Sequence, residues 1–220
     1  GADQMSSLVG RRIFVAGSMG PTSKMLSLSP DVDKPEYRAI SFDEMAEGYR
    51  HQTEGLIDGG ADLLLIETIF DALNAKAALY AISKVQENKG TDIPVMISAT
   101  INDRQGRILT GVQVEELYNI LSHYPIFSFG LNCSFGASDM EPIIASLASL
   151  LPCAVSIYPN AGLPDTLGGY PETPEITAGY IREIARKGYL NIAGGCCGTT
   201  PDHIREIAKV LKDIPPRQFP

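Results

Sequence analysis

Two adjacent cysteines, Cys196 and Cys197, lie in a glycine-rich segment and could bind a metal ion. They follow an apolar run, residues 189–193, of the kind that is typical of a β-strand. A third cysteine, Cys133, follows another such run, residues 126–131. Three thiolates suit zinc and leave a fourth tetrahedral position open for a substrate. The three cysteines are therefore candidate ligands of a catalytic metal ion.

The two cysteines are adjacent in sequence, which restricts the backbone conformation in which they can bind one metal ion. Neighbouring side chains of an extended strand point to opposite faces, so Cys196 and Cys197 can share one metal only where the chain leaves strand geometry. Glycines on both sides of the pair permit that departure. We therefore expect the pair to lie in a loop after the strand.

Other interpretations of the cysteines remain open. A disulfide between Cys196 and Cys197 would form a strained ring and would leave Cys133 without a role. Three unrelated buried thiols are a second alternative, although the surrounding glycines favour exposed loops. An iron–sulfur cluster usually requires four thiolates. The fourth cysteine, Cys153, opens a separate apolar run and is interpreted as a small core residue.

Composition limits the classes of partner. The chain has 220 residues, of which 44% are hydrophobic, enough for one substantial core. Its net charge of −8 argues against nucleic acid or an anionic membrane surface as a partner. No apolar run reaches the ~18 residues of a membrane span, and the first residues lack a signal-peptide pattern. We therefore expect a cytoplasmic, reducing location in which cysteines need not form disulfides.

Short apolar runs alternate with helical segments along the chain, which predicts a parallel sheet with right-handed crossovers. The expected strands cover residues 12–16, 61–67, 94–100, 126–131, 153–158 and 189–193. The expected helices cover residues 2–8, 41–59, 71–86, 114–122, 140–150, 175–186 and 201–211.

Polar residues gather directly after the expected strands, where a (β/α)8 barrel or a doubly wound sheet places its active site. They are Ser18, Glu67, Asn132, Cys133, Ser134, Asn160, Cys196 and Cys197. Only about six strands are expected, whereas a closed barrel of this kind needs eight. Either the chain has further strands that its sequence pattern does not indicate, the sheet is open, or the chain is part of a larger protein.

Two of these polar residues allow a functional and a structural interpretation. Glu67 ends a buried run, where a carboxylate is costly unless it is paired. It could receive a substrate ammonium group, or it could be satisfied by backbone amides or Thr68. Asn160 could be a turn residue, or its amide oxygen could point to the open metal position or the substrate. The histidines fall on expected helices without ligand spacing, and no nucleotide-binding glycine motif is present.

Three segments resemble the zinc-dependent homocysteine S-methyltransferases: Gly130-Leu-Asn-Cys133-Ser134, Pro159-Asn160-Ala-Gly162 and Gly194-Gly-Cys196-Cys197-Gly-Thr-Thr-Pro201. Residues 65–76, the opening segment 15–21 and the proline-rich tail are most similar to the homocysteine-binding module of cobalamin-dependent methionine synthases.

The resemblance implies a (β/α)8 barrel of the TIM type, truncated to strands 3–8 because segments matching the first two strands are missing. It implies zinc ligation by Cys133, Cys196 and Cys197, and contact of Glu67 with the homocysteine amino group. Asn132 and Asn160 are further candidate substrate contacts. Residues 1–213 are then a partial barrel domain, and residues 214–220 a linker stub toward a following module.

The implied activity is zinc-dependent activation of the homocysteine thiol for methyl transfer, which forms methionine. The implied methyl donor is methylcobalamin on another module, so that cobalamin- and folate-binding modules of the same polypeptide are expected partners. Betaine- or S-methylmethionine-dependent enzymes remain alternatives, as does a non-catalytic zinc or redox-dithiol module. A barrel without its first strands has unpaired edges at residues 12–16 and 189–193, which favours self-association.

Overall fold

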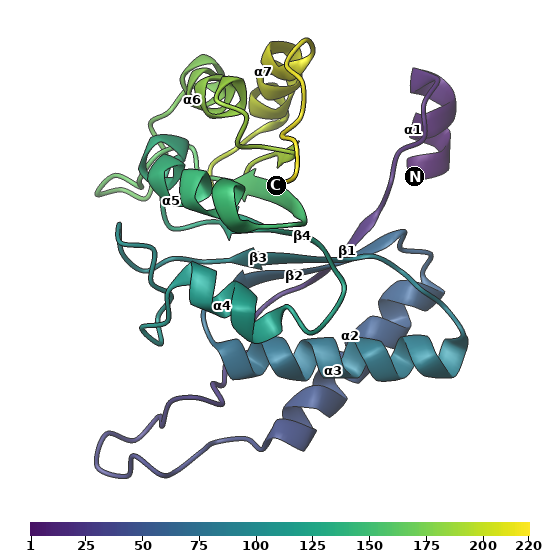
Figure 1. Cartoon of the computed structure of the whole chain (residues 1–220), viewed down its shortest axis with the longest axis vertical. Helices are drawn as coiled ribbons and strands as arrows, with labels where there is room; N and C mark the ends of the chain where they lie inside the picture. The colour runs from purple at the N-terminus through teal and green to yellow at the C-terminus, as the bar shows by residue number, and fades with distance from the viewer.

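The computed structural model describes residues 1–220 and shows one six-stranded sheet with helices packed against it (Figure 1). Every strand pairs in parallel with the next strand along the chain. The strands are β1 Ala16–Met19, β2 Leu63–Ile69, β3 Val95–Ala99, β4 Ile126–Asn132, β5 Ala154–Tyr158 and β6 Ile192–Ala193. The helices are α1 Ala2–Val9, α2 Phe42–Asp58, α3 Ala72–Lys89, α4 Val114–Leu121, α5 Ala137–Leu150, α6 Pro174–Arg186 and α7 Pro201–Leu211.

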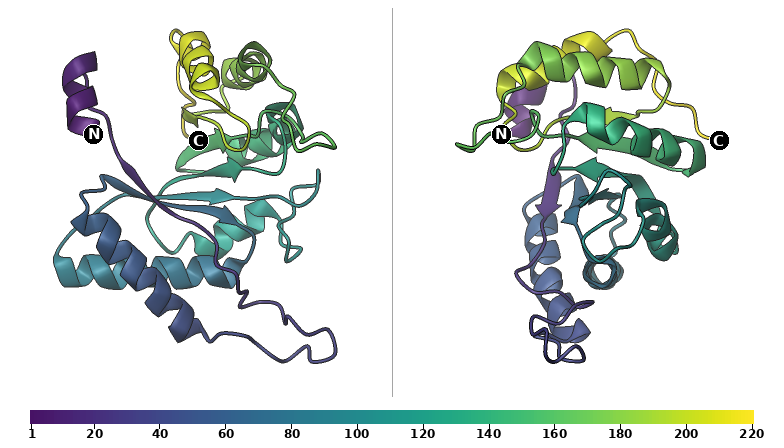
Figure 2. Two further views of the ribbon diagram at one scale, coloured as in Figure 1. Left: turned by 180° about the vertical axis from the view of Figure 1, so that it is seen from behind. Right: turned by 90° about the vertical axis from the view of Figure 1, so that its left-hand side faces the viewer.

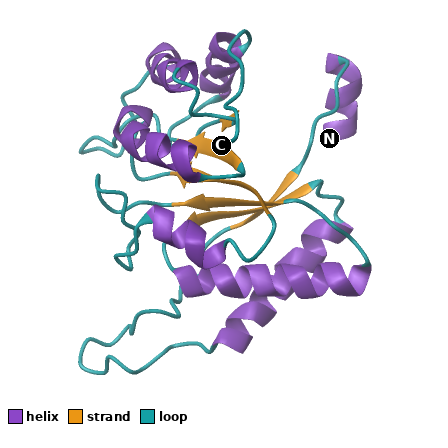
Figure 3. Ribbon diagram, in the orientation of Figure 1, coloured by secondary structure: helices purple, strands orange, loops and turns teal.

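The sheet curls into a half-barrel, with helices α2 to α7 on its outside (Figures 2 and 3). In a doubly wound sheet the strand order reverses at a switch point, and no reversal occurs here. The fold is therefore of the barrel type, and the expectation of a barrel reduced to six strands is confirmed. None of the helices combines the length and the apolar character that a membrane-spanning segment requires.

The two faces of the curled sheet carry different side chains. Phe129 and Val155 are fully buried in the core between the sheet and the helices, where Phe129 meets Tyr118 of α4 edge to face at 5.4 Å. Residues next to them in sequence point to the other face, which in β4 and β5 carries Ser128 and Ser156. Burial on the outer face therefore stabilises the fold, and the inner face is free to carry polar groups.

Local capping explains where the two longest helices begin and end. The hydroxyl of Ser41 accepts a hydrogen bond from the N–H of Glu44, whose carboxylate accepts one from the N–H of Ser41, so α2 starts with a capping box. Asp71 accepts hydrogen bonds from the first turn of α3. Gly90, at φ 63°, ends that helix in the left-handed conformation that glycine adopts readily.

The first strand differs from its prediction. The apolar run predicts a strand over residues 12–16, but β1 begins at Ala16. Phe14 is 59% exposed, and Arg12 forms an ion pair with Asp62 at 2.6 Å. Because β1 is an edge strand, the residues before it have no second neighbour that would bury their apolar side chains.

The last strand is shorter than predicted. The run 189–193 predicts five residues, but β6 contains only Ile192–Ala193. The side-chain oxygen of Asn191 accepts a hydrogen bond from the N–H of Val155 at 2.9 Å. The backbone N–H of Asn191 donates to the carbonyl of Val155, also at 2.9 Å, but its side chain replaces the backbone carbonyl in the return bond, so that residue pairing with β5 begins at Ile192.

The residues after α7 return to the sheet and end at a buried arginine. Arg217 is 3% exposed, and its guanidinium donates hydrogen bonds to the carbonyls of Ala148, Leu151 and Cys153. Its backbone N–H donates to Leu190 at 2.8 Å. Arg217 therefore joins the end of α5 to the segment that leads into β6.

We expect Arg217→Ala to lower the free energy of unfolding by roughly 2–4 kcal/mol, because buried carbonyls lose charge-assisted hydrogen bonds. Urea denaturation measures this change. The matched control is Arg182→Ala, which removes an arginine whose ion pair with Glu183 is exposed. The control should change stability by less than about 0.5 kcal/mol. Equal effects of the two substitutions would show that Arg217 does not anchor the segment.

Candidate metal centre

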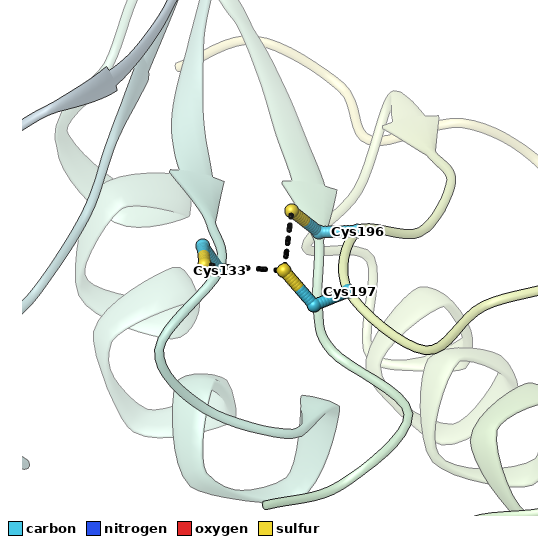
Figure 4. Close-up of side chains that lie close together, drawn as sticks. All are labelled: Cys133, Cys196 and Cys197. Atoms are coloured by element: carbon cyan, nitrogen blue, oxygen red, sulfur yellow. Dashed lines mark hydrogen bonds between the residues drawn. The ribbon is translucent and has the colours of Figure 1, made fainter. Parts of the chain in front are cut away.

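The three predicted cysteines lie together beyond the carboxyl ends of β4 and β6 (Figure 4). The Sγ atoms of Cys133 and Cys197 are 3.7 Å apart, and those of Cys196 and Cys197 are 3.9 Å apart. All three sulfurs lie within 4.8 Å of one another. Two sulfurs bound to zinc at ~2.3 Å in tetrahedral geometry are about 3.8 Å apart. The cysteines are therefore positioned to hold a metal ion.

The spacing also decides between the earlier interpretations. A disulfide brings its sulfurs to about 2.05 Å, and all four cysteines of this chain are free. The three clustered cysteines are exposed or half-buried, so they are not unrelated core residues. Cys153 is buried in the hydrophobic core, as predicted.

The backbone leaves strand geometry at Cys133, where no glycine predicts the change. Cys133 and the following Ser134 have φ of 64° and 60°, in the left-handed region. Such a conformation costs a non-glycine residue of order 1–3 kcal/mol and is concentrated at functional sites. The turn carries the chain out of β4 and is held by a hydrogen bond from the N–H of Cys133 to the carbonyl of Tyr158.

The glycines beside the cysteine pair act in two different ways. Gly198 has φ 78°, the left-handed conformation that its position predicts. Gly194 and Gly195 instead provide space. A Cβ atom on Gly194 would lie 2.8 Å from the ring of Tyr158, and one on Gly195 would lie 2.5 Å from Thr199. The pair is therefore placed by close packing as well as by backbone freedom.

Two buried asparagines tie the cysteine loops to neighbouring strands. The Asn132 amide nitrogen donates to Thr68 Oγ1 at 2.9 Å and to Cys196 Sγ at 3.9 Å, while its oxygen accepts from the N–H of Thr68 at 3.0 Å. The Asn160 oxygen accepts from the N–H of Cys197 at 3.1 Å. The structure thus brings both predicted asparagines to the cluster, in contact with the cysteines or with the strand beside them.

Glu67 lies at an irregular point of β2. The pairing of β2 with β3 shifts register between Ile66 and Ile69, and Thr68 has φ 60°. That conformation is rare for a β-branched residue, and two hydrogen bonds between Thr68 and Asn132, one in each direction, hold it. A bulge of this kind redirects a side chain. The bulge could not be predicted from the sequence, because no glycine lies at this position.

The carboxylate of Glu67 bonds to the neighbouring strand β1. It accepts a hydrogen bond from the Ser18 hydroxyl at the end of β1. Burial raises the pKa of Tyr158 of β5 to about 12, partly countered by a hydrogen bond with Ser156, and the negative charge of Glu67 adds to the rise. Glu67, Ser18 and Tyr158 therefore share one side of the site.

The sulfur cluster resists carrying negative charge by itself. Burial, followed by repulsion from Cys133 and Cys197, raises the pKa of Cys196 to about 12, although the hydrogen bond from Asn132 lowers it. A bound cation would remove this repulsion, because a metal ion lowers the pKa of its thiol ligands. The donor set and its electrostatics therefore both fit a divalent metal ion.

None of the histidines joins the cluster. His203 is 5% exposed and caps α7, with Nδ1 accepting from the N–H of Thr200 at 3.1 Å and Nε2 lying 3.0 Å from the carbonyl of Glu172. His51 lies on the exposed surface of α2, and His123 follows α4. The histidines thus lie in or beside helices and away from the cysteine cluster, in agreement with their lack of ligand spacing.

The profile of the homocysteine S-methyltransferase family matches residues 1–211. This chain belongs to the homocysteine S-methyltransferase family. The family match covers both cysteine loops, Asn160 and the strand that carries Glu67.

Solved structures of the homocysteine methyltransferase MmuM from Escherichia coli have a similar fold. The apo and metallated forms each match with a TM-score of 0.70 at 22% sequence identity. The oxidized form matches with a TM-score of 0.69 at 21% identity. Each match covers 94% of this chain and 65% of the MmuM chain. This member of the family thus spans about two thirds of the length of those structures.

We expect Cys196→Ser to lose most of its bound metal, because the hydroxyl of serine is a poor replacement for a thiolate ligand. Cys153→Ser is the matched control, since Cys153 is buried in the core away from the cluster. Elemental analysis after incubation with zinc and gel filtration measures the metal in each protein. Equal retention in the two variants would contradict the assignment of the ligands.

Proposed function

We propose that this chain binds zinc through Cys133, Cys196 and Cys197 and activates the thiol of homocysteine for methyl transfer, which forms methionine. The observation that carries the proposal is the tetrahedral spacing of three sulfurs in a member of this family. Zinc supplies a Lewis acid that favours the thiolate of a substrate over its thiol near neutral pH. A free alkyl thiol, with a pKa near ~8.5, is mostly protonated and weakly nucleophilic there.

The choice of three cysteines suits this chemistry. Three thiolate ligands carry more negative charge than a divalent cation carries positive charge. A substrate sulfur at the fourth position therefore keeps its electron density and stays nucleophilic toward a methyl group presented in line. No protein nucleophile or general base is required. The role of the protein is to position the three cysteine sulfurs and to orient the substrate.

We propose that Glu67 binds the ammonium group of homocysteine. Its carboxylate lies at the carboxyl end of β2, on the inner face that it shares with Ser18 and Tyr158. The hydrogen bond from Ser18 orients the carboxylate. The buried amides of Asn132 and Asn160 adjoin the cluster from the neighbouring strands, and we propose them as the polar wall against which the bound substrate lies.

We propose methylcobalamin, held by another module of the same polypeptide, as the methyl donor. Support comes from the similarity of residues 15–21 and 65–76 to the modular cobalamin-dependent enzymes. Betaine and S-methylmethionine are the alternative donors for the same zinc site. Methionine formation measured with each donor separately distinguishes these possibilities, because a zinc site of this kind activates the acceptor in every case.

Binding of homocysteine should release about one proton at pH 6.5–7, because a protonated thiol becomes a bound thiolate. The number released should fall as pH rises past ~8.5, where free homocysteine is already ionised. Calorimetry in buffers of different ionisation enthalpy measures it. The zinc-depleted protein is the control and should show no such release. An enthalpy of binding to the zinc protein that does not depend on the buffer would contradict thiol activation.

Glu67→Gln should weaken the binding of homocysteine more than that of 4-mercaptobutyrate, which lacks the amino group. A charge-assisted hydrogen bond contributes roughly 1.5–3 kcal/mol, equal to at least about tenfold in affinity. Competitive titration measures both ligands. Glu36→Gln, in an exposed loop, is the control. If both ligands lose affinity equally, Glu67 maintains the scaffold and does not recognise the ammonium group.

A further inference from the structure

The bulge in β2 contains Thr68, the residue that directly follows Glu67. We propose that Thr68 is a positioning residue, which fixes the direction of the Glu67 carboxylate and ties it to the cysteine loops through Asn132. The proposal rests on the function proposed above, in which Glu67 binds the ammonium group of homocysteine. It adds the residue that sets where the ammonium site lies relative to the metal centre.

The first observation is the burial pattern around the bulge. Ile66 and Ile69 are both buried in the core, at 2% and 5% exposure, although they are three residues apart. In a regular strand, residues three positions apart face opposite sides of the sheet. The bulge adds one residue, since Glu67 and Thr68 lie opposite the single residue Ser98 of β3. It therefore lets both half-buried side chains turn away from the core while the two isoleucines stay in it.

The second observation is the backbone conformation of Thr68. Its φ of 60° is rare for a β-branched residue, whereas a glycine would adopt it readily. Strained backbone persists only where the surrounding structure holds it, and it is concentrated at functional sites. A threonine at this position, in place of glycine, therefore indicates a role for its side chain.

The third observation is a reciprocal pair of hydrogen bonds. The N–H of Thr68 donates to Oδ1 of Asn132 at 3.0 Å, and Nδ2 of Asn132 donates to Oγ1 of Thr68 at 2.9 Å. Asn132 is 1% exposed and directly precedes Cys133, and its Nδ2 also lies 3.9 Å from the Cys196 sulfur. One side-chain amide thus holds the bulge and contacts the cysteine cluster.

The end of β3 connects the two residues a second time. β3 lies between β2 and β4, so the side chain of Asn132 reaches past it to the bulge. The N–H of Thr100, directly after β3, donates to the carbonyl of Ile69 at 2.8 Å, and its hydroxyl donates to the carbonyl of Asn132 at 3.1 Å. The carboxyl ends of β2, β3 and β4 therefore form one connected unit, and Glu67 lies within it.

Thr68→Val tests the proposal, because it keeps the shape of the side chain and removes the oxygen that accepts the bond from Asn132. At saturating zinc, the variant should bind homocysteine about tenfold more weakly, since a buried amide donor loses its partner and the bulge loses one of its two bonds. Binding of 4-mercaptobutyrate, which lacks the amino group, should change less than about twofold. Competitive titration measures both ligands.

Three further variants separate positioning from general damage. Thr68→Ser keeps the hydroxyl and should bind homocysteine within about twofold of the wild type. Thr68→Gly adopts the left-handed conformation without strain but lacks the hydroxyl, so it should show the same selective loss even if the valine variant does not fold. Thr91→Val is the matched control, because the Thr91 hydroxyl has no hydrogen-bond partner and lies before β3, at the opposite end of the sheet from the cysteines.

The control should leave the affinity for both ligands unchanged. A variant without the hydroxyl that loses affinity equally for homocysteine and 4-mercaptobutyrate, or for neither, would overturn the proposal. A serine variant as weak as the valine variant would also overturn it.

A double-mutant cycle shows whether Thr68 acts through Glu67. In the Glu67→Gln background, Thr68→Val should cause no further loss of homocysteine affinity, because no carboxylate remains to be misplaced. Additive losses would contradict the proposal, since they would mean that the two residues act independently.

Crystal structures of the wild type and of Thr68→Val without ligand separate this proposal from the proposed function. If the wild-type protein does not prefer homocysteine to 4-mercaptobutyrate, the proposed role of Glu67 fails, and the structures still test what orients its carboxylate. In the variant, we expect residue 68 to leave the left-handed region and the Glu67 carboxylate to move away from the Ser18 hydroxyl. An unchanged backbone with the bond between Glu67 and Ser18 intact would overturn the positioning role of Thr68.

Discussion

Repulsion among three sulfurs that lie within 4.8 Å of one another is the constraint on which the rest of the site depends. Thiolates at this distance repel one another, and burial together with this repulsion raises the pKa of Cys196. They also require a backbone that brings them together at a cost. The left-handed conformations of Cys133 and Ser134 carry part of that cost. A bound metal ion would offset the repulsion and the backbone cost, and the fold positions the three cysteines to hold one.

The half-barrel supplies the frame that holds this strained arrangement. Parallel strands in sequential order bring their carboxyl ends to one rim. Glu67 of β2, Asn132 of β4 and the loop after β6 therefore meet, although they are far apart in sequence. The outer face of the sheet packs on the helices in one apolar core. Because stability comes from that outer face, the inner face can carry polar and strained residues.

Much of this arrangement could be predicted from the sequence. The features that could not be predicted depend on contacts that form only in the folded chain. The cysteine trio, the capping box at Ser41 and the buried Cys153 follow from residue type and spacing. The turn at Cys133 and the bulge at Thr68 do not, because both use residues that rarely adopt left-handed φ and both depend on partners in other strands.

X-ray absorption at the zinc edge tests the central claim most directly, since it counts the sulfur neighbours of the metal. The zinc-loaded protein should show three sulfurs at ~2.3 Å together with one lighter ligand. Addition of homocysteine should replace that lighter ligand with a fourth sulfur at a similar distance. A spectrum that homocysteine leaves unchanged, or one with fewer than three sulfurs in the first place, would contradict a site in which three cysteines hold the metal that activates the substrate thiol.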